Sequence, residues 1–494
     1  MVPFGPFLPD QADLGNPGAT IANNVLPRTA ATYGPFPALS AVSAALANRP
    51  QGAGSFTQNE GTVHTFCGDS DDLFKLSATS WSNVSKSSGA YTVATTDTVN
   101  FIQFGDRVIS VDGHTDPPQS YVMGTSSAFA DLAGSPPRAK VSAVVKDFVV
   151  FGNTWDATDG AKSNRIWWSS LNDPTDWPTI GSADAAAKQS DRQDLPVGGQ
   201  VQAIVGAIGG MDGAIFCKRA IFKLQYVGPP TVFNVLPVER DRGTLAPNSV
   251  VNVGPFGFYL GEEGFYTFTG SGSKPIGDQK VDKFFLDDLD HNNIHRVYGA
   301  GDPLSRQVYW AYPAVGNTGG RPNKVIIYNW AVDRWATAEV EQEFMFRNLS
   351  IEVTLDGMDG YGNMDALGVS LDDPSWIGGL TILNGFNEDK KLARFTGAPL
   401  AASLETQEIG GTGRIFVNGV RPYVDGGTVT IKLRYRDEPG DAVTESSENG
   451  IDADGQAHFT VSTRFARAQV NVAAGGSWTH AQGVDAEVAE DGGA

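Results

Sequence analysis

Cysteine is nearly absent from this sequence of 494 residues, which contains only Cys67 and Cys217. Two cysteines so far apart cannot form a disulfide framework, and they are too few for a cysteine-rich zinc site. A free cysteine usually behaves as a small, buried apolar side chain. We therefore expect two buried free thiols in a protein that folds in a reducing compartment.

Clustered positive charge is also missing. The chain has 36 Lys and Arg residues against 56 Asp and Glu residues, a formal net charge of −20. Proteins that grip nucleic acid present grouped Lys and Arg side chains to the phosphates. This composition disfavours sequence-specific DNA binding. It is compatible with an acidic surface along which DNA slides without sticking, because like charges repel.

Targeting and membrane signals are missing as well. The N-terminus has no basic segment followed by an apolar stretch, so we expect no secretory signal. No apolar run approaches the roughly 18 residues that a membrane-spanning helix needs. These features predict a protein made in the cytoplasm without a membrane-spanning segment.

Glycine and proline, by contrast, are abundant, with 58 and 28 residues scattered along the chain. Hydrophobic residues make up 41% of the sequence, which is ample for a packed core. Many short apolar runs between turn residues predict an all-β protein.

Residues 1–55 are rich in Pro and Gly and predict an extended arm, with a short helix at 40–48. From 56 to 404, apolar runs alternate with tight polar turns, which predicts antiparallel hairpins. Hairpins that recur about every 40–60 residues are typical of β-propeller blades, of which we expect about six to eight. The predicted hairpins lie at 101–111, 144–151, 214–224, 257–268 and 325–335.

One helix is expected to interrupt the blades at about 278–297. Its apolar positions Val281, Phe284, Phe285 and Leu289 follow helical spacing, and Asp278 is the expected N-cap. Residues 405–485 predict a separate small β-sandwich or barrel, with strands at 414–417, 429–435, 458–462 and 468–472. The remaining residues, 486–494, predict a frayed acidic tail.

Catalytic signatures are lacking. There is no phosphate-binding P-loop, dinucleotide fingerprint or nucleophile elbow, so we expect no enzyme and assign no catalytic residue. Paired carboxylates of the kind found in glycosidases meet only in space, so a glycan hydrolase stays open at this stage.

Metal ligands and cofactors are not assigned either. His291 and His295 are four residues apart, but no glutamate follows the first, and a polar helix end is the preferred interpretation. Two acidic groups have oxygen ligands at spacings that could hold Ca²⁺, although solvated turns are preferred for both. They are Asp356, Asp359, Asn363 and Asp365, and Asp69, Asp71 and Asp72.

Trp167, Trp168 and Trp177 form an aromatic group around a turn at Asn172-Asp173-Pro174. Exposed tryptophans can stack on sugars, but tryptophan is highly buried on average. We therefore favour core packing for these side chains.

Several strings, taken in order, resemble the tail nozzle proteins of short-tailed bacteriophages. They begin with Leu8-Pro-Asp10 and Asp13-Leu-Gly15-Asn-Pro-Gly18, and continue through Arg165-Ile-Trp167-Trp-Ser169 and Arg242-Gly-Thr-Leu-Ala246. They end with Arg421-Pro-Tyr-Val424 and Trp478-Thr-His480-Ala-Gln-Gly483. The similarity covers nearly the whole chain, although no single string is diagnostic.

The resemblance implies a β-propeller protein of the virion tail, assembled in the host cytoplasm as a homohexameric tube below the portal. It implies contacts with the head-to-tail adaptor and with tail fibres, spikes or a needle, and transient passage of double-stranded DNA. The alternative is a carbohydrate-binding or glycan-cleaving receptor-recognition propeller of a phage tail. For the tube, we expect acidic turns such as Glu262-Glu263 and Asp287-Asp288 to contribute to the lumen.

Overall fold

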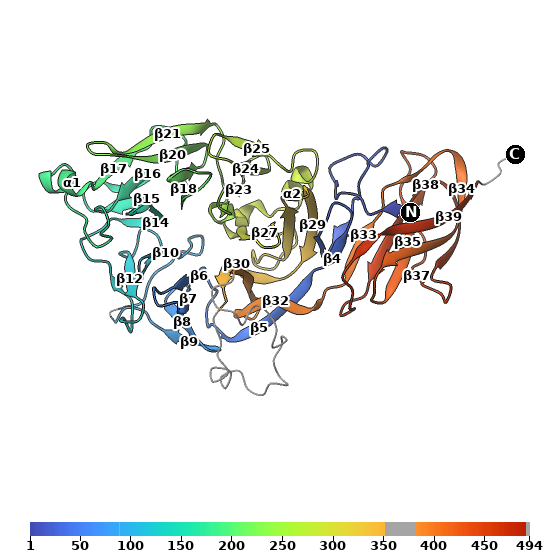
Figure 1. Cartoon of the computed structure of the whole chain (residues 1–494), viewed down its shortest axis with the longest axis horizontal. Helices are drawn as coiled ribbons and strands as arrows, with labels where there is room; N and C mark the ends of the chain where they lie inside the picture. Colours follow the sequence, from blue (N-terminus) through green and yellow to red (C-terminus); the bar gives the residue numbers. More distant parts are fainter. Residues whose placement is uncertain (88, 351–380, 491–494) are drawn as a thin grey trace.

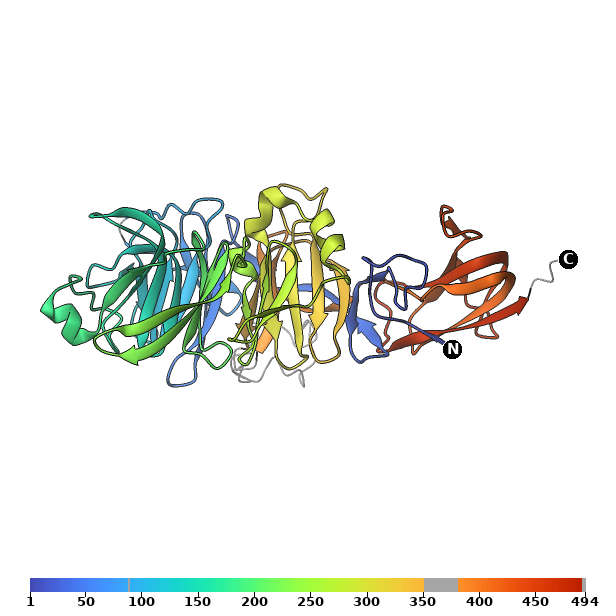
Figure 2. The same ribbon diagram turned by 90° about the horizontal axis from the view of Figure 1, so that it is seen from above.

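The computed structural model describes residues 1–87, 89–350 and 381–490, and most of its regular structure is β-strand. A ring of small sheets is joined on one side to a second β unit, and the two ends of the described chain lie at that unit (Figure 1). Seen from above, the two parts lie end to end in an elongated body (Figure 2). The all-β propeller fold predicted from the sequence is confirmed.

Six separate four-stranded antiparallel sheets form propeller blades within the described residues. Five are built from consecutive strands. The first is β6 (Gly52–Thr57), β7 (Val63–Gly68), β8 (Leu73–Ser77) and β9 (Ser80–Asn83). The second is β10 (Asn100–Phe104), β11 (Arg107–Val111), β12 (Gln119–Val122) and β13 (Ala130–Asp131). The third is β14 (Arg138–Val145), β15 (Phe148–Asp156), β16 (Gly160–Trp168) and β17 (Asp191–Asp194).

The fourth blade is β18 (Val201–Gly206), β19 (Gly213–Cys217), β20 (Ala220–Gly228) and β21 (Val232–Arg240). The fifth is β22 (Val251–Asn252), β23 (Gly257–Leu260), β24 (Phe265–Phe268) and β25 (Ser273–Pro275). All five hairpins predicted from the sequence are present, four of them as β10–β11, β14–β15, β19–β20 and β23–β24, and the fifth, at 325–335, in the next group of strands.

A further four-stranded meander follows the fifth blade: β26 (Tyr298–Asp302), β27 (Gln307–Tyr312), β28 (Lys324–Asn329) and β29 (Arg334–Glu339). The first strand, β26, contacts β22 on one side and β30 (Gln342–Leu349) on the other, so the meander occupies a position in the ring. It is not a separate sheet, because β29 also pairs with the arm strand β2 (Ala22–Asn23) and so joins a 15-stranded sheet.

The last blade contains β30 (Gln342–Leu349), β31 (Thr381–Asn387), β32 (Lys391–Pro399) and, from the other end of the chain, β5 (Pro37–Ala45). The helix predicted at 40–48 is therefore wrong. Its alanines favour a helix, but intrinsic propensity is a weak determinant of structure, and antiparallel pairing with β32 overrides it. Since β5 belongs to a blade and β6 begins at Gly52, the separate arm ends near residue 36 rather than 55.

The blades pack through alternating side chains. In β15, Phe148 and Val150 belong to a hydrophobic cluster shared with the next blade, whereas Val149 and Phe151 belong to a cluster shared with the preceding one. Successive residues of a strand face opposite sides of the sheet, so a strand between two neighbours is apolar on both. This explains the continuous apolar runs in the sequence.

Helical structure is limited to short segments in the described residues: α1 (Ala183–Lys188), η1 (Pro247–Ser249), α2 (Asp282–Asp288) and η2 (His291–Arg296). The predicted N-cap at Asp278 is wrong, because α2 begins after Val281. The cap is supplied by the arm. The Asp10 carboxylate accepts hydrogen bonds from the backbone N–H groups of Lys283 (2.9 Å) and Phe284 (2.7 Å).

The C-terminal unit contains β33 (Ala402–Glu405), β34 (Ile409–Val424), β35 (Val429–Arg436), β36 (Thr444–Glu445), β37 (Asn449–Gly450), β38 (Ala457–Val472) and β39 (Ala481–Glu490). The long strand β38 pairs with β34 along its first half and with β33 and β35 along its second half. Residues 486–490 are the end of β39 and pair with β34, so the frayed tail predicted there is wrong.

The arm joins the two parts. β2 lies between β29 of the ring and β33 of the C-terminal unit. The other arm strands, β1 (Val2–Pro3), β3 (Val25–Pro27) and β4 (Tyr33–Pro35), connect to β39. A single hydrophobic cluster runs through the arm, the β26–β29 meander and the C-terminal unit.

Candidate functional site

The two candidate histidines near the helix have different surroundings. His291 is exposed, and its Nε2 lies 3.1 Å from the carbonyl oxygen of Leu286. His295 is half-buried, and burial together with the nearby Arg49 lowers its pKa. Neither belongs to the one metal-compatible group found in the described part of the chain.

The acidic turn at Asp69 has a structural role. The Asp69 Oδ1 atom accepts hydrogen bonds from the backbone N–H groups of Asp71 and Asp72, both at 2.9 Å. This local pattern shapes the turn between β7 and β8. The other group considered for Ca²⁺, Asp356, Asp359, Asn363 and Asp365, lies outside the described residues.

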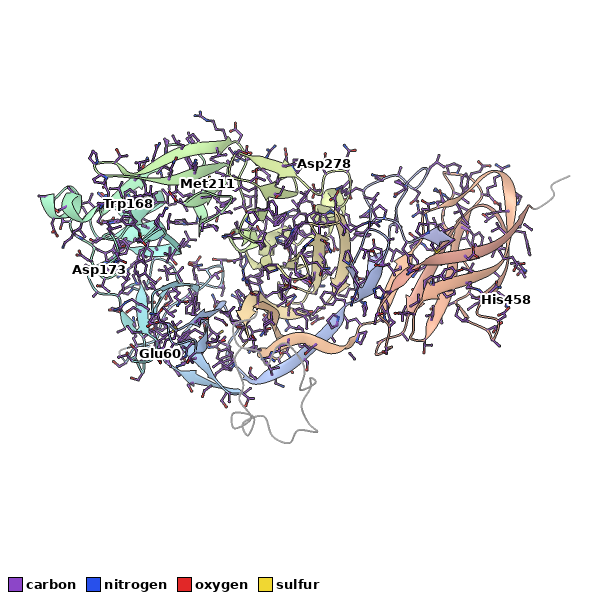
Figure 3. All side chains as sticks on the ribbon, in the orientation of Figure 1. Glu60, Trp168, Asp173, Met211, Asp278 and His458 are labelled. Atoms are coloured by element: carbon purple, nitrogen blue, oxygen red, sulfur yellow. The ribbon has the colours of Figure 1, made fainter. Side chains whose placement is uncertain are left out.

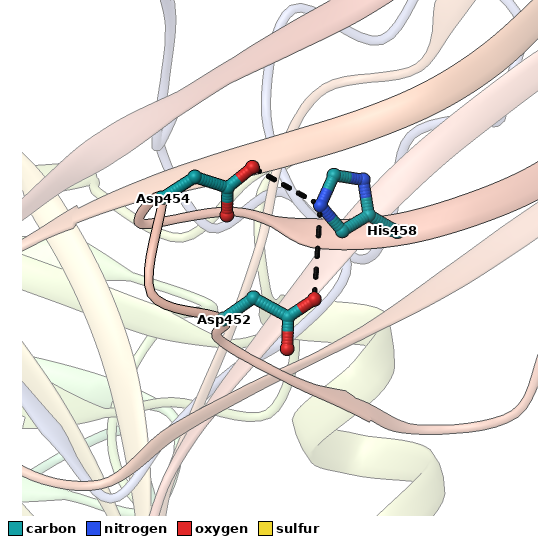
Figure 4. A group of neighbouring side chains, drawn as sticks. All are labelled: Asp452, Asp454 and His458. Atoms are coloured by element: carbon teal, nitrogen blue, oxygen red, sulfur yellow. Dashed lines mark hydrogen bonds and ion pairs between the residues drawn. The ribbon is translucent and has the colours of Figure 1, made fainter.

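Asp452, Asp454 and His458 form the metal-compatible group, which the sequence analysis did not single out (Figure 4). The His458 Nε2 atom lies 3.1 Å from Asp454 and 3.7 Å from Asp452. All three side chains are exposed at the turn that leads into β38. The cluster therefore has the character of a solvated turn held by ion pairs, which carries little energy.

A hydroxyl, an imidazole and a carboxylate also meet at Thr479, His480 and Asp425. The Thr479 Oγ1 atom lies 2.7 Å from Nδ1 of His480, but it donates to Asp425. The Asp425 carboxylate also accepts hydrogen bonds from the backbone N–H groups of Thr479 and His480. The carboxylate thus fastens the loop before β39, and the hydroxyl is not oriented as an activated nucleophile.

The tryptophans form core contacts, as predicted. Trp168 and Trp177 are buried, and Trp177 stacks on Phe151 with ring centroids 4.9 Å apart. Trp167 is half-buried beneath the Arg192 guanidinium. Cys67 and Cys217 are buried free thiols, as expected. Trp168 lies in the ring and His458 in the C-terminal unit, so the tryptophans and the histidine–carboxylate cluster belong to different parts of the molecule (Figure 3).

The acidic turns considered for a lumen are partly neutralised within the chain. Glu262 lies 4.0 Å from Arg219, and Asp287 is paired with Lys283. Asp288 is less exposed and bonds to Lys324 at 2.9 Å. Glu262 and Asp287 remain more than half exposed, so their carboxylates stay in contact with solvent.

A polar cavity of about 480 Å³ lies where the first strands of adjacent blades begin. Its walls come from the starts of β10, β14 and β18 and from η1 and η2, which precede β22 and β26. The first strands of neighbouring units contact one another, so the cavity lies at one mouth of the ring's centre. Its polar side chains include Asn100, Asn153, Gln200, Gln202 and Asn248.

No helix in the described residues is long and apolar enough to cross a membrane. No family model matches the chain, and no curated protein matches it.

Two solved structures with some likeness are extracellular domains described as parts of hybrid two-component systems of B. thetaiotaomicron. Each shares 9% sequence identity with the chain. The first has a TM-score of 0.43, and the match covers 86% of this chain and 48% of that structure. The second has a TM-score of 0.38, and the match covers 86% of this chain and 50% of that structure. The chain spans about half the length of these structures, and likeness of this degree carries no functional argument.

Proposed function

We propose that this chain is a structural virion protein that forms the tail nozzle of a short-tailed bacteriophage. In this role, six copies form a conduit below the portal and adaptor through which the genome is retained and ejected. The observation that carries the proposal is the ordered sequence resemblance, which extends from Leu8 to Gly483.

The way in which the two parts are joined supports this role. Glu405 is fully buried and bonds to Arg434 at 2.6 Å, to Arg467 at 3.2 Å and to the Thr20 hydroxyl of the arm at 2.7 Å. The arm is thereby tied to the C-terminal unit by charges as well as by strand pairing. A subunit of a tube benefits from such a joint, because ring closure requires a fixed angle between neighbours.

The charge of the chain supports passage of DNA without retention. At a net charge of −20, the protein repels phosphates at long range, and the exposed carboxylates of Glu262 and Asp287 add local repulsion. No basic recognition patch is needed for this function, since the conduit only guides the duplex.

Mass photometry of the chain, alone and mixed with the portal–adaptor complex of the same phage, tests the proposal. One chain has a mass of 52.4 kDa, so six copies add about 314 kDa to the complex. That increment is the expected result. A chain that ignores the adaptor at all concentrations would exclude the nozzle role, whereas a free monomer that assembles only on the adaptor agrees with it.

A receptor-recognition propeller that binds or cleaves glycans is the second candidate, and the polar cavity at the centre of the ring favours it. Such a protein is expected to turn over or retain host glycans without the adaptor. A glycan array and a reducing-end assay distinguish it from a nozzle, which gives neither signal.

A further inference from the structure

Another cavity, of about 650 Å³, opens at one end of the fourth blade. Its wall comes from the loop that precedes β18, the turn between β19 and β20, and the chain that follows β21. The turn is held against the loop by two backbone hydrogen bonds. The N–H of Lys218 donates to the carbonyl oxygen of Gln200 at 3.0 Å, and the N–H of Arg219 donates to that of Gly198 at 3.0 Å. Strand pairing and these hydrogen bonds therefore fix the segments that form the cavity.

Three cationic side chains line this cavity: Lys218, Arg219 and Arg240. Arg240 is the direct cross-strand partner of Ala220, so the side chains of these two residues point to the same face of the blade. Gly198 packs against that face, because a Cβ atom on Gly198 would lie only 2.4 Å from the Cβ atom of Ala220. Arg240 therefore lies on the side of the blade that the loop covers.

Negative charge is scarcer than positive charge at this cavity. Asp241 supplies the one carboxylate among the described residues of the wall. Lys218 and Arg240 form no ion pair with any described residue, and Arg219 has only Glu262, whose carboxylate lies 4.0 Å away. Three positive charges thus face two negative ones, even when Glu262 is counted. A net positive charge remains here, although the chain as a whole carries −20.

The rest of the wall is compatible with an anion. Val197 and Leu245 are apolar, and low-dielectric walls concentrate the field of nearby charges. Gly199 leaves open space, because a Cβ atom on it would have only the Lys218 Cβ atom nearby, at 4.0 Å. The backbone N–H of Gly199 has no acceptor among the described residues, so it remains available as a further donor.

We infer that this cavity is a binding site for a small phosphate anion with several charges, a polyphosphate or a nucleotide. A guanidinium group donates two parallel hydrogen bonds to phosphate oxygens, and the Lys218 ammonium adds a point charge. A volume of about 650 Å³ lies in the range of small-molecule pockets. The inference goes beyond the nozzle role and does not depend on it, because a conduit subunit needs no bound phosphate.

A small anion differs from duplex DNA in the charges that it meets. At about 0.1 M salt, screening limits the field of a charge to about 10 Å. A small anion in the cavity therefore interacts mainly with the three cations of the wall. A long duplex extends over much more of the surface and meets the excess of carboxylates. Binding of a small phosphate anion is thus compatible with a chain that repels DNA.

Isothermal titration calorimetry of the full chain with tripolyphosphate and with ATP, in buffer free of divalent cations, tests the inference. Each anion is titrated to about 10 mM, ten times a millimolar Kd. Saturable binding that weakens as the salt concentration rises is the expected result. Equal affinities would support a site that recognises the phosphate groups alone, and tighter binding of ATP would support a nucleotide site.

The Arg240→Gln variant removes one guanidinium from the wall and should weaken binding by about tenfold. Lys223→Gln is the matched control, since Lys223 lies on β20 of the same blade, forms no ion pair with a described residue and does not line the cavity. It changes the net charge by the same amount, and its affinity should stay within about twofold of the unmodified chain.

A variant with the opposite effect completes the test. Asp241→Asn removes the carboxylate of the wall and should tighten binding by about threefold. Asparagine tolerates the left-handed backbone of this position, where φ is 64°. Absence of saturable binding of both anions would overturn the inference, and so would equal affinities of the Arg240→Gln and Lys223→Gln variants.

Discussion

At the scale of single residues, buried carboxyl groups control how stability depends on pH. Burial raises the pKa of Asp282 to about 7, and burial together with Asp116 raises that of Asp112 to about 7. The ordinary value, near 3.8, applies in the unfolded chain. The folded state therefore holds protons that the unfolded state releases, and each group costs stability as pH rises from about 4 to above 7.

Replacing Asp282 by Asn removes this cost. The amide oxygen can still accept the Phe265 backbone N–H, which lies 3.0 Å from Oδ1. The free energy of unfolding of the Asp282→Asn variant, measured relative to that of the unmodified chain, should rise by on the order of 1 kcal/mol from pH 5 to pH 8. This figure allows for partial solvent screening. Thermal unfolding followed by circular dichroism at both pH values measures the gain.

Asp287→Asn is the control, because Asp287 is exposed on the same helix and pairs only with Lys283. Its effect should stay within about 0.5 kcal/mol at either pH. An Asp282→Asn variant whose stability relative to the unmodified chain does not change with pH would contradict the assignment of a raised pKa.

The sequence predicts single residues well where composition decides their environment. Cys67, Cys217, Trp168 and Trp177 are buried as expected, because apolar side chains must leave water. The burial of Gln202 and Asn153 could not be predicted in this way. It is set by a slip in strand register, and register depends on partner strands that periodicity does not reveal.

At the scale of elements, β5 closes the ring, because it supplies the outer strand of a blade whose other strands lie some 300 residues later in the chain. Local hairpins were predictable, since their two strands adjoin in sequence. Closure by β5 and capping of α2 by Asp10 were not, since both partners come from distant parts of the chain.

Leu39 of β5 packs against the hydrophobic cluster of the last blade, whereas Ala41 on the same strand is exposed. Leu39→Asp should lower the free energy of unfolding by about 2–4 kcal/mol, because it places a charge at an apolar contact. Ala41→Asp should change it by no more than about 0.5 kcal/mol. Urea unfolding followed by tryptophan fluorescence compares the two, and equal effects would count against β5 as the closing strand.

Glu405 tests the joint between arm and C-terminal unit. Glu405→Ala removes the buried carboxylate that pairs with Arg434 and Arg467, and it leaves the Arg467 guanidinium paired with Asp13. Loss of this buried carboxylate should cost about 3 kcal/mol. Glu445→Ala removes an exposed carboxylate that pairs with Lys432 and Arg434, and it should change the stability much less, because solvent screens exposed ion pairs. Differential scanning calorimetry separates the two; a Glu405→Ala variant as stable as Glu445→Ala would show that the buried ion pairs do not hold the joint.

At the scale of the whole molecule, net charge governs encounters with nucleic acid. The chain should not bind duplex DNA at low ionic strength, because its charge of −20 repels phosphates. Replacing Glu262 and Glu263 by lysine reduces the charge to −16 and should produce weak, salt-sensitive binding. Fluorescence anisotropy of a labelled duplex measures DNA binding by the unmodified chain and by the double variant. Tight binding by the unmodified chain would contradict a surface that repels DNA.

The fold of the whole molecule was predictable from recurring hairpins, whereas its assembly is not encoded in any periodic pattern. Negative-stain electron microscopy of the chain bound to the portal–adaptor complex tests the central claim most directly. The nozzle role predicts a six-fold ring coaxial with the portal, with an open lumen. Class averages that show a three-fold fibre, or chains scattered off the portal axis, would contradict it.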